Sequence, residues 1–537
     1  MKYNKSLILS ACAASIFFRC ATIKVTNVPI KNLSEIASKQ AEINEKERRT
    51  WGHLDILSDS LPGMSVEKTY TEIIKDKKGK KVIVAVIDSG IDIDHEDLED
   101  VIWVNKKEVP GNDVDDDKNG YVDDVHGWNF LGNAYNEQLE YVRLIKRNID
   151  FNGKEEAQAK YSEELKKAKQ IMVRYEGILK RVEGAHKILE SHFVETNYTK
   201  ADINNLISED TIVTQAAQFA KQMYGYGLES MTNAIEELQG GIDYFSKRIN
   251  INLNIELSGR TTGDDPDNFS QISYGNGNVK HITKDETHGT HVAGIIAAKR
   301  DNGLGVDGIA SDVQIMAIRA VPNGDEYDKD VALAIRYAAD NGAKVINTSF
   351  GKAYSPHSDK VRNAIAYAAS KDALIVNAAG NDAIDLDENK SYPNDAVDNG
   401  SEVADNFITV GALSPSIGED FVANFSNYGK INVDVFAPGA KIYSTTPENT
   451  YDFKDGTSMA APAVAGVAAL IRSYFPKLSA SQVKSVIMTS GLPINNEVVI
   501  GGNSSIKLSF DAISKSGKIV NAYNAFILAS RMTRWTF

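Results

Sequence analysis

Three segments of the sequence carry side chains that together could turn a hydroxyl group into a nucleophile. Asp88 ends the run VIVAVID, His288 opens HGTHVAGIIAA, and Ser458 opens a helix-like stretch after Gly456. A serine hydroxyl is a weak nucleophile at neutral pH unless a histidine takes its proton, and a carboxylate must hold that imidazole in the right tautomer. The three residue types therefore predict a nucleophilic triad that attacks a carbonyl carbon.

Each of these residues also has an ordinary structural explanation. Serine is a favoured helix N-cap, Asp88 could cap a turn, and His288 could cap its own helix. His291 follows three residues after His288 and competes with it for the role of base. The three local sequences taken together favour the triad, because all three are less often found together by chance than any one of them alone.

Strand-like and helix-like segments alternate around these residues and could position them. Short runs rich in β-branched residues suit strands that are buried on both faces of a parallel sheet. The runs cover residues 82–87, 313–318, 343–350, 373–380 and 407–412, and helix-like segments cover 330–342 and 358–372. This alternation predicts a doubly wound α/β fold, a mostly parallel sheet flanked by helices, with its site at the carboxyl ends of the strands.

Residues 134–258 interrupt this alternation. Apolar residues there recur at alternating spacings of three and four, first from Leu165 to Phe193 and again from Leu228 to Ile249. This spacing predicts two long amphipathic helices packed as an antiparallel hairpin, an inserted α-helical subdomain with His186 as a tolerated polar residue in its seam. A lid, a partner-binding arm and a folding aid are all compatible with such an insertion.

The composition narrows the class of protein. The 537 residues carry a net charge of −14, which argues against a nucleic-acid partner because phosphate binding needs clustered Lys and Arg. The two cysteines, Cys12 and Cys20, both lie near the N-terminus. No disulfide framework can hold the body of the chain, so packing or metal ions must stabilise it.

The first 24 residues have the pattern of an export signal. Two lysines precede an apolar stretch that is too short to span a membrane. Leu9-Ser10-Ala11-Cys12 resembles a bacterial lipobox, which predicts a lipid anchor at Cys12 and a secreted or cell-surface (outer-membrane) protein. Ordinary secretion is the alternative, because the apolar stretch before Cys12 is short. Residues 25–50 are interpreted as a spacer, and residues 51–133 and 259–537 as the α/β domain.

The three triad segments also resemble a known family. VIDSGID, HGTHVAG and GTSMAAPAVAG are similar to the signature segments of the subtilisin-like serine proteases (subtilases, peptidase family S8), in the same chain order. The resemblance implies a serine endopeptidase in which Asp88 orients the base, His288 is the general base and then acid, and Ser458 is the nucleophile. VNAAGND resembles the family's oxyanion segment, so Asn381 would donate to the developing oxyanion beside the Ser458 backbone N–H.

The resemblance also implies how a substrate binds. INTSFG resembles the strand that pairs with an extended protein or peptide substrate, a mode that favours unstructured chains. The expected walls of the pocket for the residue before the scissile bond are Ser349, Phe350 and Gly351 on one side, and Ala378, Ala379 and Gly380 on the other.

The chain departs from the family's usual pattern in two places. Asp88 and His288 are far apart in the sequence, which the helical insertion explains, and Ala463 stands where many relatives carry a histidine that is not catalytic. Two other functions stay open. One is a catalytically silent protein that binds a partner through its helical arm, and the other is an esterase that uses the same triad.

An acidic segment, GNDVDDDKNGYVDDVHGWNF, could bind calcium. Asp115, Asp117, Asn119, the Tyr121 carbonyl and Asp123 fit positions 1, 3, 5, 7 and 9 of a calcium loop, with Gly120 at position 6. Position 12 is His126 instead of the usual bidentate Glu, so a flanking acid would have to complete the set of ligands. The alternative is a solvated acidic loop. The sequence predicts a structural calcium ion here.

Overall fold

The structure is a computed structural model that describes residues 43–151, 153–193 and 198–534. The predicted export signal, with Cys12, lies outside the described residues. Of the predicted spacer only residues 43–50 are described, and Glu45–Thr50 form helix α1, whose N-terminus is capped by Asn44. Among the described helices, none combines the length and the apolar composition that a membrane crossing requires.

A large, mostly parallel sheet forms the centre of the molecule. Within the described residues it has nine strands in the order β10-β13-β7-β6-β5-β4-β1-β3-β2. Only the β10–β13 pair is antiparallel. The strands are β1 (Val82–Asp88), β2 (Gly127–Asn129), β3 (Val313–Arg319), β4 (Val345–Thr348), β5 (Leu374–Ala378), β6 (Phe407–Leu413), β7 (Val435–Pro438), β10 (Leu492–Pro493) and β13 (Lys518–Ile519).

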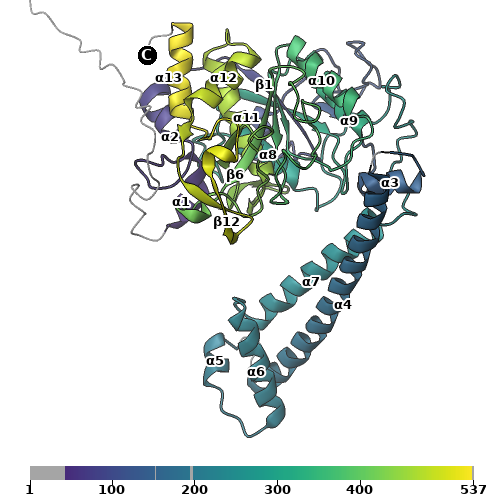
Figure 1. Ribbon diagram of the computed structural model, residues 1–537, viewed down its shortest axis with the longest axis vertical. Coiled ribbons are helices and arrows are strands. Elements are labelled where there is room, and N and C mark those ends of the chain that lie inside the picture. The colour runs from purple at the N-terminus through teal and green to yellow at the C-terminus, as the bar shows by residue number, and fades with distance from the viewer. Residues whose placement is uncertain (1–42, 152, 194–197, 535–537) are drawn as a thin grey trace, which may run out of the picture.

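Helices cover both faces of this sheet (Figure 1). Val84 and Val86 of β1 pack in one core cluster with α8 (His288–Ala297), α11 (Thr457–Tyr474), α12 (Ala480–Ser490) and α13 (Ala522–Thr533). Ala85 and Ile87, which point to the opposite face, pack with α9 (Asp328–Asp340) and α10 (Ser358–Ser370). Burial of both faces explains why the strands are continuously apolar, and it confirms the predicted doubly wound α/β fold.

Smaller elements complete this part of the chain. The two antiparallel hairpins are β8 (Ile442–Thr446) with β9 (Thr450–Lys454) and β11 (Glu497–Ile500) with β12 (Asn503–Ser509). The short helical turns are η2 (Trp51–His53), α2 (Val66–Lys68), η3 (Thr69–Ile74), η4 (Glu99–Val101), η6 (Glu419–Phe421) and η7 (Phe510–Ala512).

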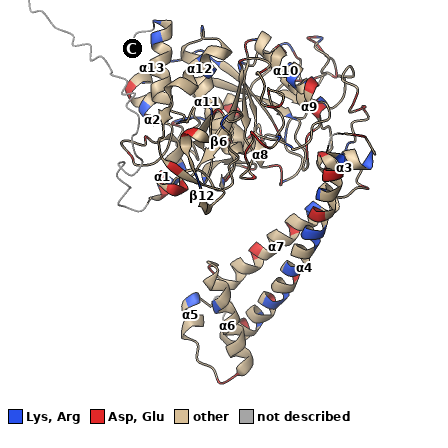
Figure 2. Ribbon diagram, in the orientation of Figure 1, with Lys and Arg blue, Asp and Glu red and all other residues tan. Residues whose placement is uncertain are grey.

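A helical arm projects from one side of the sheet domain, and Figure 1 shows it as the teal-blue hairpin below α3. It lies between β2 and α8 in the chain, inside the segment that the sequence predicts as an insertion. Its elements are α3 (Glu140–Lys146), α4 (Lys154–Phe193), α5 (Lys200–Asn205), α6 (Thr211–Gly225), α7 (Met231–Lys247) and the π-helical turn η5 (Arg248–Asn252). Lys, Arg, Asp and Glu alternate along α4 (Figure 2).

The arm has its own apolar contacts. Far from the sheet, Val182 and Leu189 of α4 pack with residues of α6 and α7. At the root, Tyr141 of α3 and Ala168 of α4 pack with Leu253. His186 lies in the seam, partly buried, with its Nδ1 2.6 Å from the Tyr198 hydroxyl, so this polar residue has a partner within the arm.

Candidate active site

Three neighbouring strands end at the edge of the sheet where the predicted site residues lie. Asp88 is the last residue of β1, Ser349 follows β4, and Asn381 lies three residues beyond β5. Because β1, β4 and β5 are adjacent and parallel, their carboxyl ends meet at one edge. Helix α8, which begins at His288, and helix α11, which begins at Thr457, pack against each other. The topology thus gathers segments that are far apart in the sequence.

The start of α8 sets the position of His288. Gly289 allows this helix to approach the loop after β1, because a Cβ at Gly289 would lie 2.6 Å from the Ser89 carbonyl oxygen. The Gly289 N–H donates to the Ser89 hydroxyl at 3.1 Å. His288 Nδ1 then lies 2.7 Å from Asp88 Oδ1, with Asp88 1% exposed and the imidazole side chain 37% exposed.

This contact decides which ring nitrogen of His288 is free. A carboxylate accepts a hydrogen bond, so Nδ1 carries the proton and Nε2 remains an acceptor on the exposed side of the ring. The Ser89 N–H also donates to Asp88 Oδ1 at 2.8 Å, whereas Asp88 Oδ2 is buried without a hydrogen-bond partner in the described part of the chain. The arrangement presents an imidazole that can take a proton at Nε2.

The competing histidine, His291, is excluded as the base by its surroundings. It is fully buried, and its Nε2 donates to the carbonyl oxygens of Ile442 and Asp452, both at 3.1 Å. Burial, together with the nearby Lys454 ammonium, lowers the pKa of His291 to about 3. It is a neutral residue that joins α8 to the β8–β9 hairpin.

Ser458 and Asn381 lie together at the N-terminus of α11. The Asn381 Oδ1 accepts from the Thr457 N–H at 2.8 Å and from the Thr457 hydroxyl at 3.0 Å. Its Nδ2 has no hydrogen-bond partner among the described residues and is available as a donor at the Ser458 end of α11. Gly380 makes the turn that places Asn381, with φ at +102° and no room for a Cβ beside Asn427. The Ser458 hydroxyl donates to the Ser349 carbonyl at 3.0 Å.

One cavity of about 340 Å³ contains most of the predicted substrate-binding residues together with Ser458 and Asn381. Phe350 and Gly351 line one side, and Ala378 and Gly380 line the other. Ser349 is buried beneath the cavity, where its hydroxyl donates to the Ser458 carbonyl at 2.9 Å.

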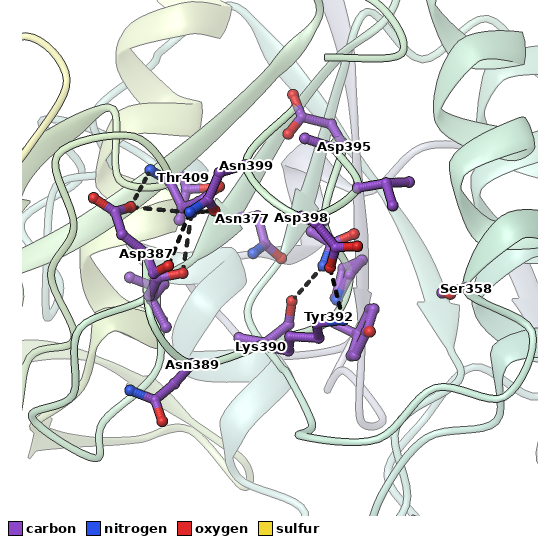
Figure 3. A pocket seen from close by; sticks show the side chains of 18 of the residues that line it. Ser358, Asn377, Asp387, Asn389, Lys390, Tyr392, Asp395, Asp398, Asn399 and Thr409 are labelled. Carbon is purple, nitrogen blue, oxygen red and sulfur yellow. Dashed lines mark hydrogen bonds and ion pairs between the residues drawn. The ribbon is translucent and has the colours of Figure 1, made fainter. Parts of the chain in front are cut away.

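Figure 3 shows a second cavity, of about 400 Å³. Ala378, Lys390 and Ser391 line both this cavity and the first. Ala379 lines this second cavity instead of the first. The loop that lines it is held by the Lys390–Asp398 ion pair, at 2.7 Å, by the Asn399 side chain donating to the Asp387 carbonyl, and by the Asn432 N–H donating to the Asp387 carboxylate. Residues 386–399, which the sequence analysis did not single out, form most of the lining of this cavity.

The acidic segment folds into a compact loop between β1 and β2. Carboxylate oxygens of Asp115, Asp117 and Glu108 lie within 4.8 Å of one another. The Asn119 N–H donates to Asp117 and the Gly120 N–H donates to Asp115, while the Asn119 Oδ1 accepts from the Tyr121 N–H. Asn119 and Tyr121 are thereby held close to the two aspartates. Asp123 is turned elsewhere: its two oxygens accept the N–H groups of residues 111–113.

Glu108 is the acidic residue that sequence reasoning missed. It is 6% exposed, one carboxylate oxygen accepts the Asp117 N–H at 3.1 Å, and the other is buried with no hydrogen-bond partner among the described residues. Glu108 precedes Asp115 in the chain, whereas the calcium-loop pattern seeks its last ligand downstream. Oxygen donors from several carboxylates, one of them unpaired and buried, fit a hard cation such as calcium.

Comparison with known proteins relates the chain to one family. The model of the subtilase family matches residues 79–504. The thermophilic serine proteinase of Bacillus sp. (strain AK1) is 45% identical over 188 residues, which cover 35% of this chain and 42% of that protein. Thermitase of Thermoactinomyces vulgaris is 38% identical over 235 residues, 43% of this chain and 74% of that protein.

Solved structures of proteases are also similar. A protease from Pseudoalteromonas arctica PAMC 21717 is 32% identical with a TM-score of 0.36, covering 45% of this chain and 71% of that one. This chain covers only part of some curated relatives: 42% of the Bacillus AK1 proteinase and 26% of the cell wall-associated protease of Bacillus subtilis. Since the family match covers most of the sequence and includes all three signature segments, the chain belongs to the subtilase family.

Proposed function

We propose that the protein is an exported serine endopeptidase that hydrolyses peptide bonds through an acyl-enzyme formed on Ser458. The 2.7 Å contact between Asp88 and His288, at the sheet edge that also holds Ser458, is the observation that carries the proposal. A protein that only binds a partner would not need a buried aspartate hydrogen-bonded to a partly exposed histidine. An esterase remains the second candidate, and hydrolysis of a protein substrate separates the two.

His288 takes the proton of the Ser458 hydroxyl at Nε2 as the oxygen attacks the carbonyl carbon, and later gives it to the leaving amine. The hydroxyl, which donates to the Ser349 carbonyl, must first rotate about its Cα–Cβ bond toward His288. The buried charge of Asp88 stabilises the imidazolium. The Asn381 Nδ2 and the Ser458 N–H stabilise the oxyanion, where one donor contributes about 2.7–4 kcal/mol.

Labelling with a fluorophosphonate and degradation of casein test this function. We expect one covalent adduct per chain at Ser458, identified by peptide mass, and casein cleavage that stops once labelling is complete. A folded protein that neither reacts with the probe nor degrades casein would contradict the proposal. Labelling and ester hydrolysis without any cleavage of casein would favour the esterase.

We also propose that residues 134–258 are an insertion into a peptidase domain formed by residues 51–133 and 259–537, and that residues 1–24 direct export. Sequencing the N-terminus of the mature protein tests the second point. A lipid-modified Cys12 as the first residue is expected if the lipobox is used, and a free N-terminus near residue 25 if the protein is secreted. Unprocessed Met1 on the mature protein would contradict export.

We propose further that the acidic loop holds a structural calcium ion. Glu108, Asp115 and Asp117 would supply carboxylates, with the Asn119 side chain and the Tyr121 carbonyl completing the set. The ion would neutralise the mutual repulsion of these carboxylates and join the loop to the segment around Glu108. Asp123 is left out of this set because it is not among the carboxylates that lie within 4.8 Å of one another.

Removal of calcium is expected to lower the melting temperature. A ligand at about 100 times its Kd stabilises the folded state by about 2.7 kcal/mol, which chelation would remove. Differential scanning calorimetry with calcium and with chelator measures the shift, and Glu108→Gln combined with Asp117→Asn should abolish it. Asp113→Asn, an exposed acid of the same loop outside the cluster, serves as the control. Identical melting curves in calcium and chelator would exclude the site.

A further inference from the structure

The root of the helical arm forms part of the cavity that contains Ser458. Tyr141 of α3, Glu164 of α4 and Arg248 of η5 line the same space of about 340 Å³ as Gly351 and Ser458. The residues of the arm nearest the sheet domain therefore lie at the place where a substrate would bind. In Figure 1 this root is the junction at α3 between the arm and the sheet domain.

Positive charge is in excess at this wall. Glu164 uses one oxygen to accept from the Tyr141 hydroxyl at 2.9 Å and from Arg248 Nη2 at 2.6 Å. Lys160 lies 3.8 Å from the other Glu164 oxygen and 5.6 Å from the centre of the Tyr141 ring. Two cations thus share one carboxylate. The Lys160 and Arg248 side chains are 44% and 27% exposed, and within the described part of the chain each has N–H groups left for a further acceptor.

The other charged groups of the cavity do not cancel this excess. They are Asp325, Lys352, Asp382 and Lys390. Lys352 is buried and paired with Glu140 and Asp328, and the Asp325 carboxylate accepts the Glu140 N–H. Lys390 pairs with Asp398. Asp382 adjoins Asn381 in the chain.

The wall is held firmly against the sheet domain. The segment that leads into α3 pairs with residues 323–325: the Asn323 N–H donates to Tyr135 O at 2.7 Å, and the Asp325 N–H donates to Gln138 O at 3.2 Å. Arg143 is buried and donates to the carbonyl oxygens of Gln138 and Asp325. Side chains on a wall fixed in this way can discriminate between ligands, because little ordering is needed on binding.

A substrate strand has one open backbone edge in this cavity. Gly351 is exposed, and its N–H and C=O have no hydrogen-bond partner among the described residues, whereas the edge at residues 323–325 is occupied by residues 135–138. Gly351, Lys160 and Arg248 line one cavity, so an extended peptide beside Gly351, which advances about 3.3 Å per residue, would bring side chains to the arm. We propose that Lys160 and Arg248 select an acidic substrate side chain roughly two to five positions before the scissile bond, an inference that rests on the proposed endopeptidase activity.

Peptide pairs that differ only by Glu or Gln test this selection. Each pair carries the change at one of these positions, and kcat/KM is measured at low salt. We expect at least one position at which Glu is preferred about threefold to tenfold, the range for a partly exposed, charge-assisted contact, with the preference falling as salt is added. Lys160→Gln and Arg248→Gln should each reduce this ratio, and the double variant should bring it to one.

Lys169→Gln, the same change at an exposed position of α4 outside the cavity, is the matched control and should keep the ratio of the unchanged protein. Melting temperatures identify any variant that unfolds, and Lys160→Gln should cost little stability because the Lys160 side chain is 44% exposed. Equal rates for Glu and Gln at every position, or a ratio unchanged in the double variant, would overturn the selection while fluorophosphonate labelling still supports the proposed function. Absence of both labelling and cleavage would overturn the two together.

Discussion

Replacing Ser458 by Ala is expected to lower kcat for a peptide substrate by about 10⁶-fold, which is the size of effect that loss of the nucleophile has in subtilisin. The attacking oxygen is removed, and the remaining donors, Asn381 Nδ2 and the residue 458 N–H, can only stabilise an oxyanion formed by water. The hydrogen bond from the Ser458 hydroxyl to Ser349 is also lost, at about 1 kcal/mol of folding stability. Active-site titration and kcat/KM on the same preparations measure both effects.

Ser473→Ala is the matched control, because Ser473 lies near the other end of α11 and its buried hydroxyl has no hydrogen-bond partner among the described residues. That variant should retain full activity. Casein degradation by the Ser458→Ala protein at the rate of the unchanged enzyme would show that another residue is the nucleophile.

Asp88→Asn is expected to lower kcat by about 10⁴-fold at neutral pH, as the corresponding change does in another serine protease. The amide oxygen can still accept from the Ser89 N–H and from His288 if it takes the place of Oδ1. The negative charge is gone in either orientation of the amide, so the imidazolium of His288 loses the buried anion beside it. KM should change little, since Asp88 does not line the cavity.

Asp92→Asn makes the same chemical change four residues further along the chain. Its carboxylate accepts the N–H groups of Asp94 and Glu448 and does not contact His288. The activity of this control should stay within a few-fold of the unchanged protein. If Asp88→Asn and Asp92→Asn lowered kcat equally, the effect would reflect local folding, and Asp88 would have no special role toward His288.

The sequence predicts the fold well because its strands are buried on both faces. Runs such as VIVAVI bury their side chains on both faces, as a covered parallel sheet allows, and the topology of that sheet places Asp88 at the carboxyl end of β1. The resemblance to the family assigns the role of base to His288, but the physical reason that excludes His291 needed coordinates. It depends on the carbonyls of the β8–β9 hairpin, which is distant in sequence.

Other parts of the site could not be read from local patterns. Glu108 joins Asp115 and Asp117 because the chain folds back on itself, and a pattern that runs forward from Asp115 cannot reach it. Asp123 occupies a suitable position in that pattern, but its carboxylate accepts hydrogen bonds from the N–H groups of residues 111–113 and is not part of the cluster of Glu108, Asp115 and Asp117. The approach of Arg248 to the cavity depends on how the arm docks, which the spacing of its apolar residues does not specify.

The closeness of the two ends of the arm has a consequence for how the chain reaches this arrangement. Asp88 and His288 are 200 positions apart, yet the Asn252 side chain donates to the Glu137 carbonyl across 115 of those positions. The helices of the arm are built from contacts between residues close in sequence, so they can form early. The loop that remains between Asp88 and His288 is then less than half as long, and each halving of a loop lowers the entropy cost of closing it by about 0.6 kcal/mol. The long insertion between Asp88 and His288 therefore adds little to the time these two residues need to meet during folding.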